Sequence, residues 1–349
     1  MNALDDEIIS YMKQLRFGDI HFKIDHATGL IAIIAIHNTT LGPALGGCRL
    51  REYPTLKDAI FDALRLAQGM SYKAAAADLP LGGGKSVILK PKHMHDRTKF
   101  FEAFGKFVEE MNGRYITAVD SGTSTTDMDN VSKHTKYVTS LSSAGGDPSP
   151  STARGIFRAI QAGVEFKLNK NSLDGVHVAI QGVGHVGYHL AKLLHEQGAK
   201  ISVADINQVM LQKCVDEFDA KIVSPDLIHN IECDVFSPCA LGAVINDLTI
   251  PQIKASIIIG AANNQLAEPK HGKILFDREV LYGPDYVINS GGLIHAAAEY
   301  FKTSFENANK QIDNIYNISL NIFERSAREN LPTSDIANII AEEKIYKGD

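Results

Sequence analysis

The stretch VHVAIQGVGHVGYHLAKLL, residues 176–194, decides the fold of this chain. An apolar strand expected at 176–181 runs directly into a glycine-rich turn, and an apolar helix follows from about 186 to 197. In such a turn the first glycine permits a tight bend and the second lets the backbone approach a pyrophosphate. The third lets the helix pack closely on the strand, and the helix N-terminus offers its unsatisfied N–H groups to the phosphates. The residues predicted to bind a dinucleotide are Gly182, Val183, Gly184, His185, Val186 and Gly187.

A carboxylate follows the next expected strand, 200–204, at Asp205. At this position a carboxylate can accept a hydrogen bond from the ribose 2′-hydroxyl, and its charge would repel a 2′-phosphate. The sequence therefore favours NAD over NADP as the cofactor. The alternative is a glycine-rich turn between strand and helix that binds no ligand.

Regular alternation of helices and strands extends beyond residue 150. A helix is expected at 152–166, and further strands are expected at 221–223, 234–237, 255–259 and 286–289. This alternation predicts an α/β fold with a parallel, doubly wound sheet. Glycine, proline and serine concentrate at 144–150 and mark a boundary. We expect one domain at 144–327 and a second formed by 1–143 with about 328–349; alternatively, the last helix stays with the former.

Length, charge and cysteine content narrow the class of protein. A chain of 349 residues is too long for one ordinary core. A net charge of −6 argues against a nucleic-acid or membrane-surface partner. The apolar runs are too short to span a bilayer, and the first residues lack a signal-peptide pattern. The four cysteines lack zinc-ligand spacing. We expect a cytoplasmic protein with reduced thiols and no metal.

Two lysines and one aspartate stand out in the first half. A strand is expected at 29–37, and a helix follows the capping box at 55–58. Lys73 is expected just after this helix, and Lys85 at the start of a strand that follows three glycines, 82–84. A helix at 100–111 precedes a strand at 115–119, which ends at Asp120. Charges in apolar or glycine-rich surroundings are costly without a role, although lysines are most often found at the surface.

Oxidation of an amino acid requires this set of groups. A cation must hold the α-carboxylate, a general base must deprotonate a water that attacks the iminium carbon, and a carboxylate must bind the amine and relay protons. The sequence thus suggests Lys73 for the carboxylate, Lys85 for the base and Asp120 for the amine and relay.

Two loops of the second half follow expected strand ends. One carries Cys239 and Ala240, and the other carries Asn263 and Asn264. Ligands of open α/β sheets bind beyond the carboxyl ends of the strands, so each asparagine can orient a carboxamide or a carboxylate. Equally, each can simply hydrogen-bond within its own turn.

At this point the chain resembles a known family. GPALGG (42–47), GMSYKAAAADLPLGGGKSVI (69–88), PSPSTARG (148–155), QGVGHVG (181–187), PCALG (238–242), GAANNQL (260–266) and DYVINSGGLI (285–294) resemble the glutamate/leucine/phenylalanine/valine dehydrogenases in matching order. The resemblance covers nearly the whole chain and is closest to the leucine dehydrogenase branch, which includes the valine, phenylalanine and tryptophan enzymes.

The resemblance implies a reaction and roles for particular residues. The reaction is the reversible NAD-dependent deamination of an apolar L-amino acid to its 2-oxo acid and ammonia. Lys85 matches the catalytic base, Lys73 the lysine that holds the substrate carboxylate, and Asp120 the assisting aspartate, while Gly46 and Gly47 would lie against the substrate. The implied architecture is a substrate domain, a Rossmann-type domain and a cleft that closes on binding. Homo-oligomers, either dimers or octamers, are implied as well.

The choice of amino acid would depend on an apolar pocket. By the resemblance its walls are Leu45, Ala118, Thr139, Leu293 and Ala296. Leucine-specific relatives typically carry valine at Ala296 and asparagine at His295. The smaller alanine would admit an aromatic side chain, whereas Leu293 would fill the space again. A branched-chain substrate is thus preferred, with an aromatic one as the alternative, and the lack of a pocket charge disfavours glutamate. His295 is either a polar determinant or an ordinary packed or surface residue.

Two other functional classes remain. Dehydrogenases acting on an alcohol, such as shikimate-type enzymes, also combine lysine, aspartate and a Rossmann domain, but they need no second lysine for an α-carboxylate. A non-catalytic NAD-binding sensor would keep the fold without turnover, and the presence of Lys73, Lys85 and Asp120 argues against it.

Overall fold

The chain divides into two compact units. The computed structural model describes residues 3–143 and 146–347. The first unit contains Met1–Gly146, Ala296–Thr303 and Ala341–Asp349, and the second contains Asp147–His295 and Ser304–Ile340. The sequence predicts one functional domain at 144–327 and another formed by 1–143 with about 328–349, and this division stays a prediction. Its boundary falls at residues 144–145, outside the described ranges.

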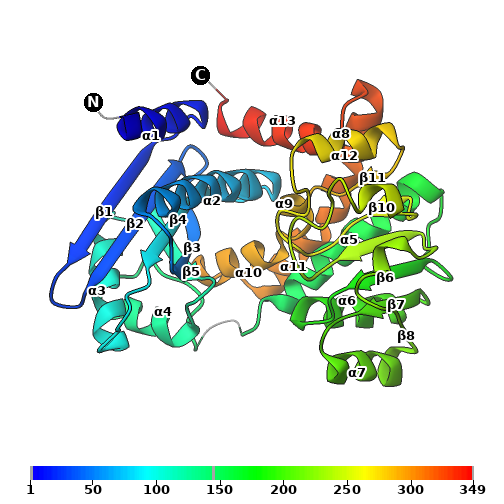
Figure 1. Cartoon of the computed structure of the whole chain (residues 1–349), viewed down its shortest axis with the longest axis horizontal. Helices are drawn as coiled ribbons and strands as arrows, with labels where there is room; N and C mark the ends of the chain where they lie inside the picture. Colours follow the sequence, from blue (N-terminus) through cyan, green and yellow to red (C-terminus); the bar gives the residue numbers. More distant parts are fainter. Residues whose placement is uncertain (1–2, 144–145, 348–349) are drawn as a thin grey trace. The chain divides into compact units, whose positions relative to one another are not determined.

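The first unit is built on a five-stranded mixed sheet (Figure 1). Its strands run in the order β1-β2-β4-β3-β5; their bounds are Asp19–Asp25 (β1), Leu30–Asn38 (β2), Ala44–Arg51 (β3), Gly82–Leu89 (β4) and Tyr115–Val119 (β5). β3 is parallel to both β4 and β5, whereas β2 is antiparallel to β1 and β4. Helices α1 (Ala3–Gln14) and α2 (Leu56–Ala76) pack on one face of the sheet, and α3 (Arg97–Glu110) and α4 (Thr125–Ser132) pack on the other.

The expected local signals account for several of these elements. The predicted strand at 29–37 appears as β2, and its alternate side chains are buried in the two cores on either face of the sheet. The predicted capping box begins α2: Thr55 accepts from the N–H of Asp58, whose carboxylate accepts from the N–H of Thr55. The phenylalanines of α3 supply much of the core on the opposite face.

The three glycines at 82–84, expected to precede a strand, instead form the beginning of β4. A Cβ on Gly83 would overlap the backbone N of Ser71, so α2 lies directly on this strand. A Cβ on Gly84 would lie 2.8 Å from the ring of Tyr115. Close packing on both sides of the strand, rather than a turn, therefore explains the glycines. Lys85 consequently lies inside the strand rather than at its start, and Lys73 lies in the last turn of α2 rather than after it.

The second unit confirms the α/β class and the doubly wound sheet. Six parallel strands run in the order β11-β10-β9-β6-β7-β8; their bounds are His177–Gln181 (β6), Lys200–Ala204 (β7), Lys221–Ile222 (β8), Val235–Pro238 (β9), Ile257–Ile258 (β10) and Leu281–Tyr282 (β11). The chain proceeds from β6 outward through β7 and β8, then returns to the other side of β6 with β9. The crevice at this reversal is where such sheets bind dinucleotides.

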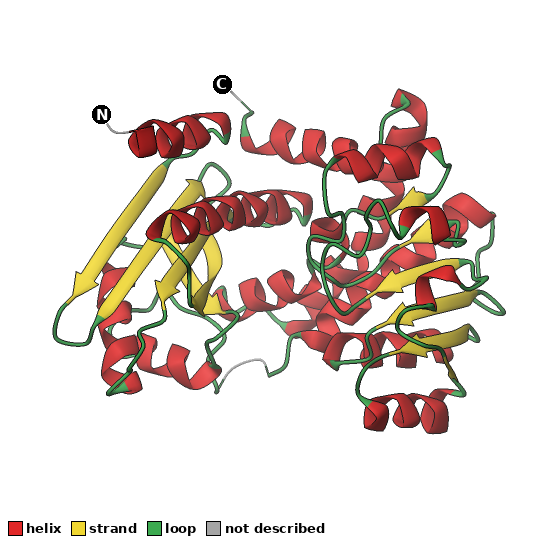
Figure 2. Cartoon of the chain, in the orientation of Figure 1, coloured by secondary structure: helices red, strands yellow, loops and turns green. Residues whose placement is uncertain are grey.

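Helices flank the second sheet on both faces (Figure 2). The helices that follow the first 146 residues are α5 (Ser149–Leu168), α6 (His185–His195), α7 (Gln208–Phe218), α8 (Lys270–Asp277), α9 (Asp285–Ile288), α10 (Gly291–Tyr300), α11 (Phe305–Asp313), α12 (Ile315–Glu329) and α13 (Thr333–Ile345). The last residues of α10 and of α13 belong to the first unit. The prediction of a strand at 286–289 was wrong. Residues 286–288 lie in α9, and Asn289 is the C-cap of this helix. A short apolar run bounded by turn residues fits either structure, and the preceding β11 already occupies the edge of the sheet.

The end of α13 packs within the first unit. Ala341 and Ile345 are buried against Ala75 of α2. The ammonium of Lys344 lies 2.6 Å from the carboxylate of Asp78, which follows α2. None of the helices in residues 3–143 and 146–347 combines the length and the apolar character needed to cross a bilayer.

Candidate active site

The glycine-rich turn lies in the second unit, between β6 and α6. Gly182 has a φ of +97°, and a Cβ on it would lie 2.7 Å from the Cβ of Ala240. A Cβ on Gly187 would overlap the carbonyl oxygen of Gly182, so this glycine lets α6 approach the turn. A Cβ on Gly184 would meet no atom within 4 Å. The turn is therefore tight at its first and last glycines and open at the middle one, which fits the approach of a pyrophosphate.

Asp205 is held in place by the backbone on both sides. The N–H of Val183 donates to its Oδ2 at 2.7 Å, and the N–H of Asn207 donates to its Oδ1 at 2.8 Å. The carboxylate thus lies beside the glycine-rich turn in a fixed orientation. Of the other turn residues, Val183 buries its side chain, whereas His185 is exposed and its Nδ1 lies 3.2 Å from the carboxylate of Asp147.

The two loops predicted to contact a ligand, which carry Cys239–Ala240 and Asn263–Asn264, follow β9 and β10 of the second sheet. The N–H of Cys239 donates to the carbonyl of Gln181 at 2.7 Å, which places Cys239 and Ala240 against the turn. The carboxamide of Asn263 accepts a hydrogen bond from Asn289 at 2.8 Å. Asn264 has a positive φ, and its N–H donates to the carboxylate of Asp285. The structure thus brings the glycine turn, Asp205, Cys239 and Ala240 together, and both asparagines take part in contacts within the protein.

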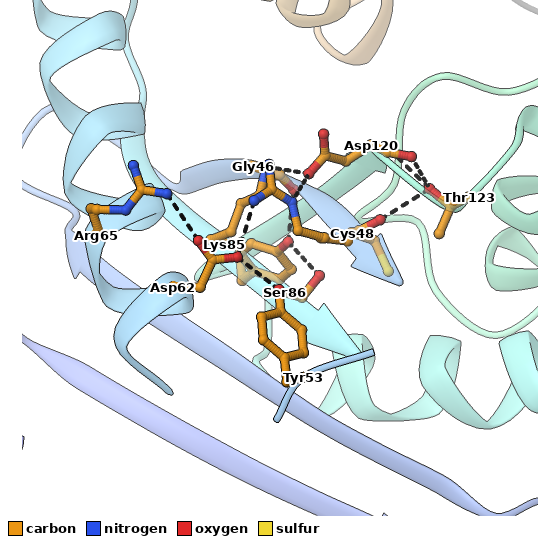
Figure 3. A network of polar contacts seen from close by, with 11 residues as sticks. Gly46, Cys48, Tyr53, Asp62, Arg65, Lys85, Ser86, Asp120 and Thr123 are labelled. Carbon is orange, nitrogen blue, oxygen red and sulfur yellow. Dashed lines mark hydrogen bonds and ion pairs between the residues drawn. The ribbon is translucent and has the colours of Figure 1, made fainter. Parts of the chain in front are cut away.

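The predicted catalytic pair meets in the first unit. The Nζ of Lys85, on β4, lies 2.7 Å from the Oδ2 of Asp120, at the end of β5 (Figure 3). The two side chains are 7% and 24% exposed, so this ion pair is largely withdrawn from water. β3 lies between the two strands and carries Gly46 and Gly47 at this point.

The glycines of β3 make room for the pair. A Cβ on Gly47 would lie 2.7 Å from the Cβ of Asp120, and one on Gly46 would overlap the carbonyl of Gly84. The hydroxyl of Tyr115 donates to the carbonyl of Gly46 at 2.7 Å and lies 2.9 Å from the hydroxyl of Ser86. The glycines therefore let the charged groups approach, and a buried hydrogen-bonded network fixes the strands that carry them.

Asp120 is kept ionised by its neighbours. Burial alone would raise the pKa of its carboxyl. The charge of Lys85, its hydrogen bond and the charge of Arg49 outweigh burial, so the pKa of Asp120 lies below its ordinary value. An ionised carboxylate at this place can bind an ammonium group or take up a proton.

A set of charged groups behind the pair did not emerge from sequence reasoning. Arg49 on β3 donates from Nε to Asp120 at 3.2 Å and from Nη1 to Asp62 on α2 at 3.0 Å. Asp62 also accepts from the hydroxyl of Tyr53 at 2.7 Å and from Arg65 at 3.0 Å (Figure 3). The one available signal was an arginine two residues after the glycines of a buried strand.

Lys73 is half-buried in the last turn of α2. The contact between Ser71 and Gly83 places this part of α2 over β4, the strand that carries Lys85. The two predicted lysines thus come from a packed helix and strand of the same unit.

The predicted pocket residues fall in both units. Leu45 on β3 and Ala118 on β5 are buried in the first unit, and Ala118 pairs with Gly47. In the same unit, the hydroxyl of Thr139 donates to the carbonyl of Ala296 at 3.1 Å. Leu293 belongs to the second unit.

His295 is also buried in the second unit. Its Nδ1 lies 3.2 Å from the hydroxyl of Ser151, and its ring centre is 5.6 Å from that of Phe305. His295 is thus buried within its unit, and its role in the choice of substrate stays a prediction.

Comparison with known proteins identifies the family. The model of the Glu/Leu/Phe/Val dehydrogenase dimerisation domain matches residues 16–137. The model of the glutamate/leucine/phenylalanine/valine dehydrogenases matches residues 146–214 and 207–348.

Individual relatives extend over nearly the whole chain. A leucine dehydrogenase of Geobacillus stearothermophilus is 48% identical over 342 residues, which cover 97% of this chain and 93% of the relative. An L-tryptophan dehydrogenase of Nostoc punctiforme is 44% identical over 316 residues, covering 90% and 89%. A crystal structure of L-tryptophan dehydrogenase from Nostoc punctiforme superposes with a TM-score of 0.89 at 40% identity, covering 97% of this chain and 98% of that one. The chain therefore belongs to the glutamate/leucine/phenylalanine/valine dehydrogenase family and is an amino-acid dehydrogenase.

Proposed function

We propose that this enzyme catalyses the reversible, NAD-dependent oxidative deamination of an apolar L-amino acid, preferably a branched-chain one such as leucine. The observation that carries the proposal is the ion pair between Lys85 and Asp120, 2.7 Å apart and largely buried beside Gly47. The relatives named leucine dehydrogenase, at 46–48% identity, support the branched-chain preference.

The proposed reaction converts an L-amino acid, NAD⁺ and water into the 2-oxo acid, ammonium, NADH and a proton. NAD⁺, held by the glycine-rich turn and Asp205, would supply the acceptor for the hydride that leaves the substrate Cα. Lys73 holds the α-carboxylate. Asp120 binds the α-ammonium group and accepts one of its protons, so that the nitrogen lone pair can form the double bond to Cα as the hydride leaves.

Hydrolysis completes the reaction. Lys85 takes a proton from water as the water oxygen bonds to Cα. Asp120 relays a proton to the nitrogen, which leaves as ammonia when its bond to Cα breaks. The departing ammonia takes the hydroxyl proton as the carbonyl of the 2-oxo acid forms, which gives ammonium, and Lys85 then releases its proton to solvent.

The proposed substrate pocket is apolar and consists of Leu45, Ala118, Thr139, Leu293 and Ala296, with Asn264 as a polar contact. No acidic or basic residue stands among these positions, so glutamate is a poor substrate in the proposal. An aromatic amino acid is the second candidate, because Ala296 leaves more space than a larger residue would. The tryptophan and phenylalanine dehydrogenases among the relatives support that candidate.

NAD is the proposed cofactor, held by residues 182–187, Asp205, Cys239, Ala240 and Asn263. The fixed carboxylate of Asp205 beside the turn supports NAD over NADP, because it can accept from a ribose hydroxyl and repels a phosphate. We also propose a cytoplasmic enzyme, consistent with four cysteines that form no disulfide.

A homo-oligomer, either a dimer or an octamer, is proposed for the working enzyme. The matched N-terminal model describes a dimerisation domain. β1 lies at the edge of its sheet and exposes Phe22 and Ile24, which supports a partner at this edge.

The first experiment measures NAD reduction by the purified protein with leucine, valine, isoleucine, phenylalanine, tryptophan and glutamate. We expect the highest kcat/KM with a branched-chain substrate. Highest kcat/KM with phenylalanine or tryptophan would select the second candidate, and no turnover with any amino acid would reject the proposed function.

The roles at the site are tested with Lys85→Ala. We expect turnover to fall by about 100-fold or more, because a general base contributes at least that much. Binding of NADH, followed by its fluorescence, should be retained. Near-normal turnover would reject Lys85 as the base.

A further inference from the structure

The ion pair at the proposed catalytic site is the inner end of a longer series of charges. Asp120 Oδ2 receives two cations, the Nζ of Lys85 at 2.7 Å and the Nε of Arg49 at 3.2 Å. Arg49 extends in turn to Asp62 at 3.0 Å, and Asp62 extends to Arg65 at 3.0 Å. The signs alternate from the buried strand β4 to the surface of α2.

Burial and hydrogen bonds hold the side chain of Arg49 in this position. Its side chain is 19% exposed, and that of Asp62 is 14% exposed. A guanidinium presents several N–H groups in a rigid fork, and here Nε and Nη1 each contact a different carboxylate. The hydroxyl of Tyr53 donates to the same oxygen of Asp62 that receives Arg49, which fixes the outer carboxylate.

We infer that Arg49 is a positioning residue, which keeps Asp120 ionised and oriented when Lys85 is neutral during the catalytic cycle. This inference rests on the proposed function, in which Lys85 must be neutral to accept a proton from water. A neutral lysine no longer compensates the charge of Asp120, and a buried carboxylate without a cation tends to take up a proton. Arg49 stays charged at every accessible pH, so the carboxylate stays available for the amino group.

Asp62 has the opposite electrostatic effect on the same pair. Its negative charge partly neutralises Arg49, and it also tethers the guanidinium to α2. Removing Arg49 should raise the pH at which the Lys85–Asp120 pair loses its proton. Removing the charge of Asp62 should lower that pH.

The pH dependence involves all the groups around the pair. The titratable and charged groups that interact with Asp120 or its partners include Lys85 on β4, Arg49 and Cys48 on β3, Tyr115 on β5, Tyr53 between β3 and α2, and Asp62 and Arg65 on α2. Burial raises the pKa of both Cys48 and Tyr115, so these two stay neutral near pH 7 and the charged residues control the titration.

The test compares the pH profiles of kcat/KM for Arg49→Gln and Asp62→Asn with that of the wild type. In the direction of amino-acid oxidation we expect the acid limb to move up by roughly one pH unit in Arg49→Gln. We expect it to move down in Asp62→Asn. Arg49→Lys keeps the cation but cannot reach both carboxylates, so its limb should lie near that of the wild type while its kcat is lower.

The matched control is Arg97→Gln, which removes an arginine paired with the buried Asp127 at 2.7 Å in the same unit. This variant should lower stability without moving the acid limb. If both Arg49→Gln and Asp62→Asn keep the wild-type limb, or shift it in the same direction, the inference is overturned. A wild-type enzyme that oxidises no amino acid would instead reject the proposed function.

Discussion

At the scale of single residues, the backbone fixes the orientation of the Asp205 carboxylate. Two N–H groups hold its two carboxylate oxygens, which keeps the charge beside the glycine-rich turn. We expect Asp205→Ser to lower kcat/KM with NAD by about tenfold or more, because a hydrogen bond to a charged group is lost. The same variant should raise the relative activity with NADP, because the repulsion of a 2′-phosphate disappears.

Steady-state kinetics with both cofactors measure this change. The exposed Asp226 lies in the same unit, and Asp226→Ser removes the same charge. This control should keep the wild-type preference. A NAD preference in Asp205→Ser equal to that of Asp226→Ser would show that Asp205 does not select the cofactor.

At the scale of elements, the contact between α2 and β4 depends on one glycine. Gly83 has no room for a Cβ beside the backbone of Ser71, whose hydroxyl lies 2.8 Å from the Nδ1 of His37. Gly83→Ala should therefore displace α2 and reduce the free energy of unfolding by about 1–3 kcal/mol. Gly69 lies in the same helix, and a Cβ on it would meet nothing within 4 Å.

The control substitution should have the opposite effect. Gly69→Ala removes backbone freedom from the unfolded chain and should raise the free energy of unfolding by about 0.5–1 kcal/mol. Urea unfolding followed by circular dichroism measures both values. Equal midpoints for Gly83→Ala and Gly69→Ala would contradict the close packing of α2 on β4.

The contact between α2 and β4 illustrates which features of the fold could be predicted from the sequence and which could not. The glycine-rich turn and the strands at 177–181 and 200–204 could be predicted, because each carries a local requirement for particular residues. The glycines of β4 were expected to precede the strand rather than to belong to it, because the packing that requires them involves α2 and Tyr115, which are distant in sequence. Arg49 was missed for the same reason: its partner Asp62 belongs to a helix, and no spacing rule connects the two.

At the scale of the whole molecule, the last residues complete the first unit. Ile345 is 2% exposed and packs with Ala341 and Ala75. Ile345→Ala should cost about 2–4 kcal/mol of local stability. We expect hydrogen exchange, measured by mass spectrometry, to accelerate in peptides of α2, while peptides at 176–204 in the second unit keep their protection.

Lys347→Ala provides the control, because this exposed residue follows the same helix. Its exchange should match that of the wild type. Uniform acceleration across both units in Ile345→Ala would argue that the C-terminal segment acts on the entire chain rather than on the first unit.

The return of α13 to the first unit also affects the order of events during translation. After Gly146 the ribosome must add roughly 200 residues before Ala341 exists, which takes about 10–40 s at typical elongation rates. During that interval Ala75 and its neighbours on α2 lack their covering helix. A nascent chain of this enzyme therefore exposes an apolar patch for most of its synthesis, and chaperones that recognise such patches have time to bind it.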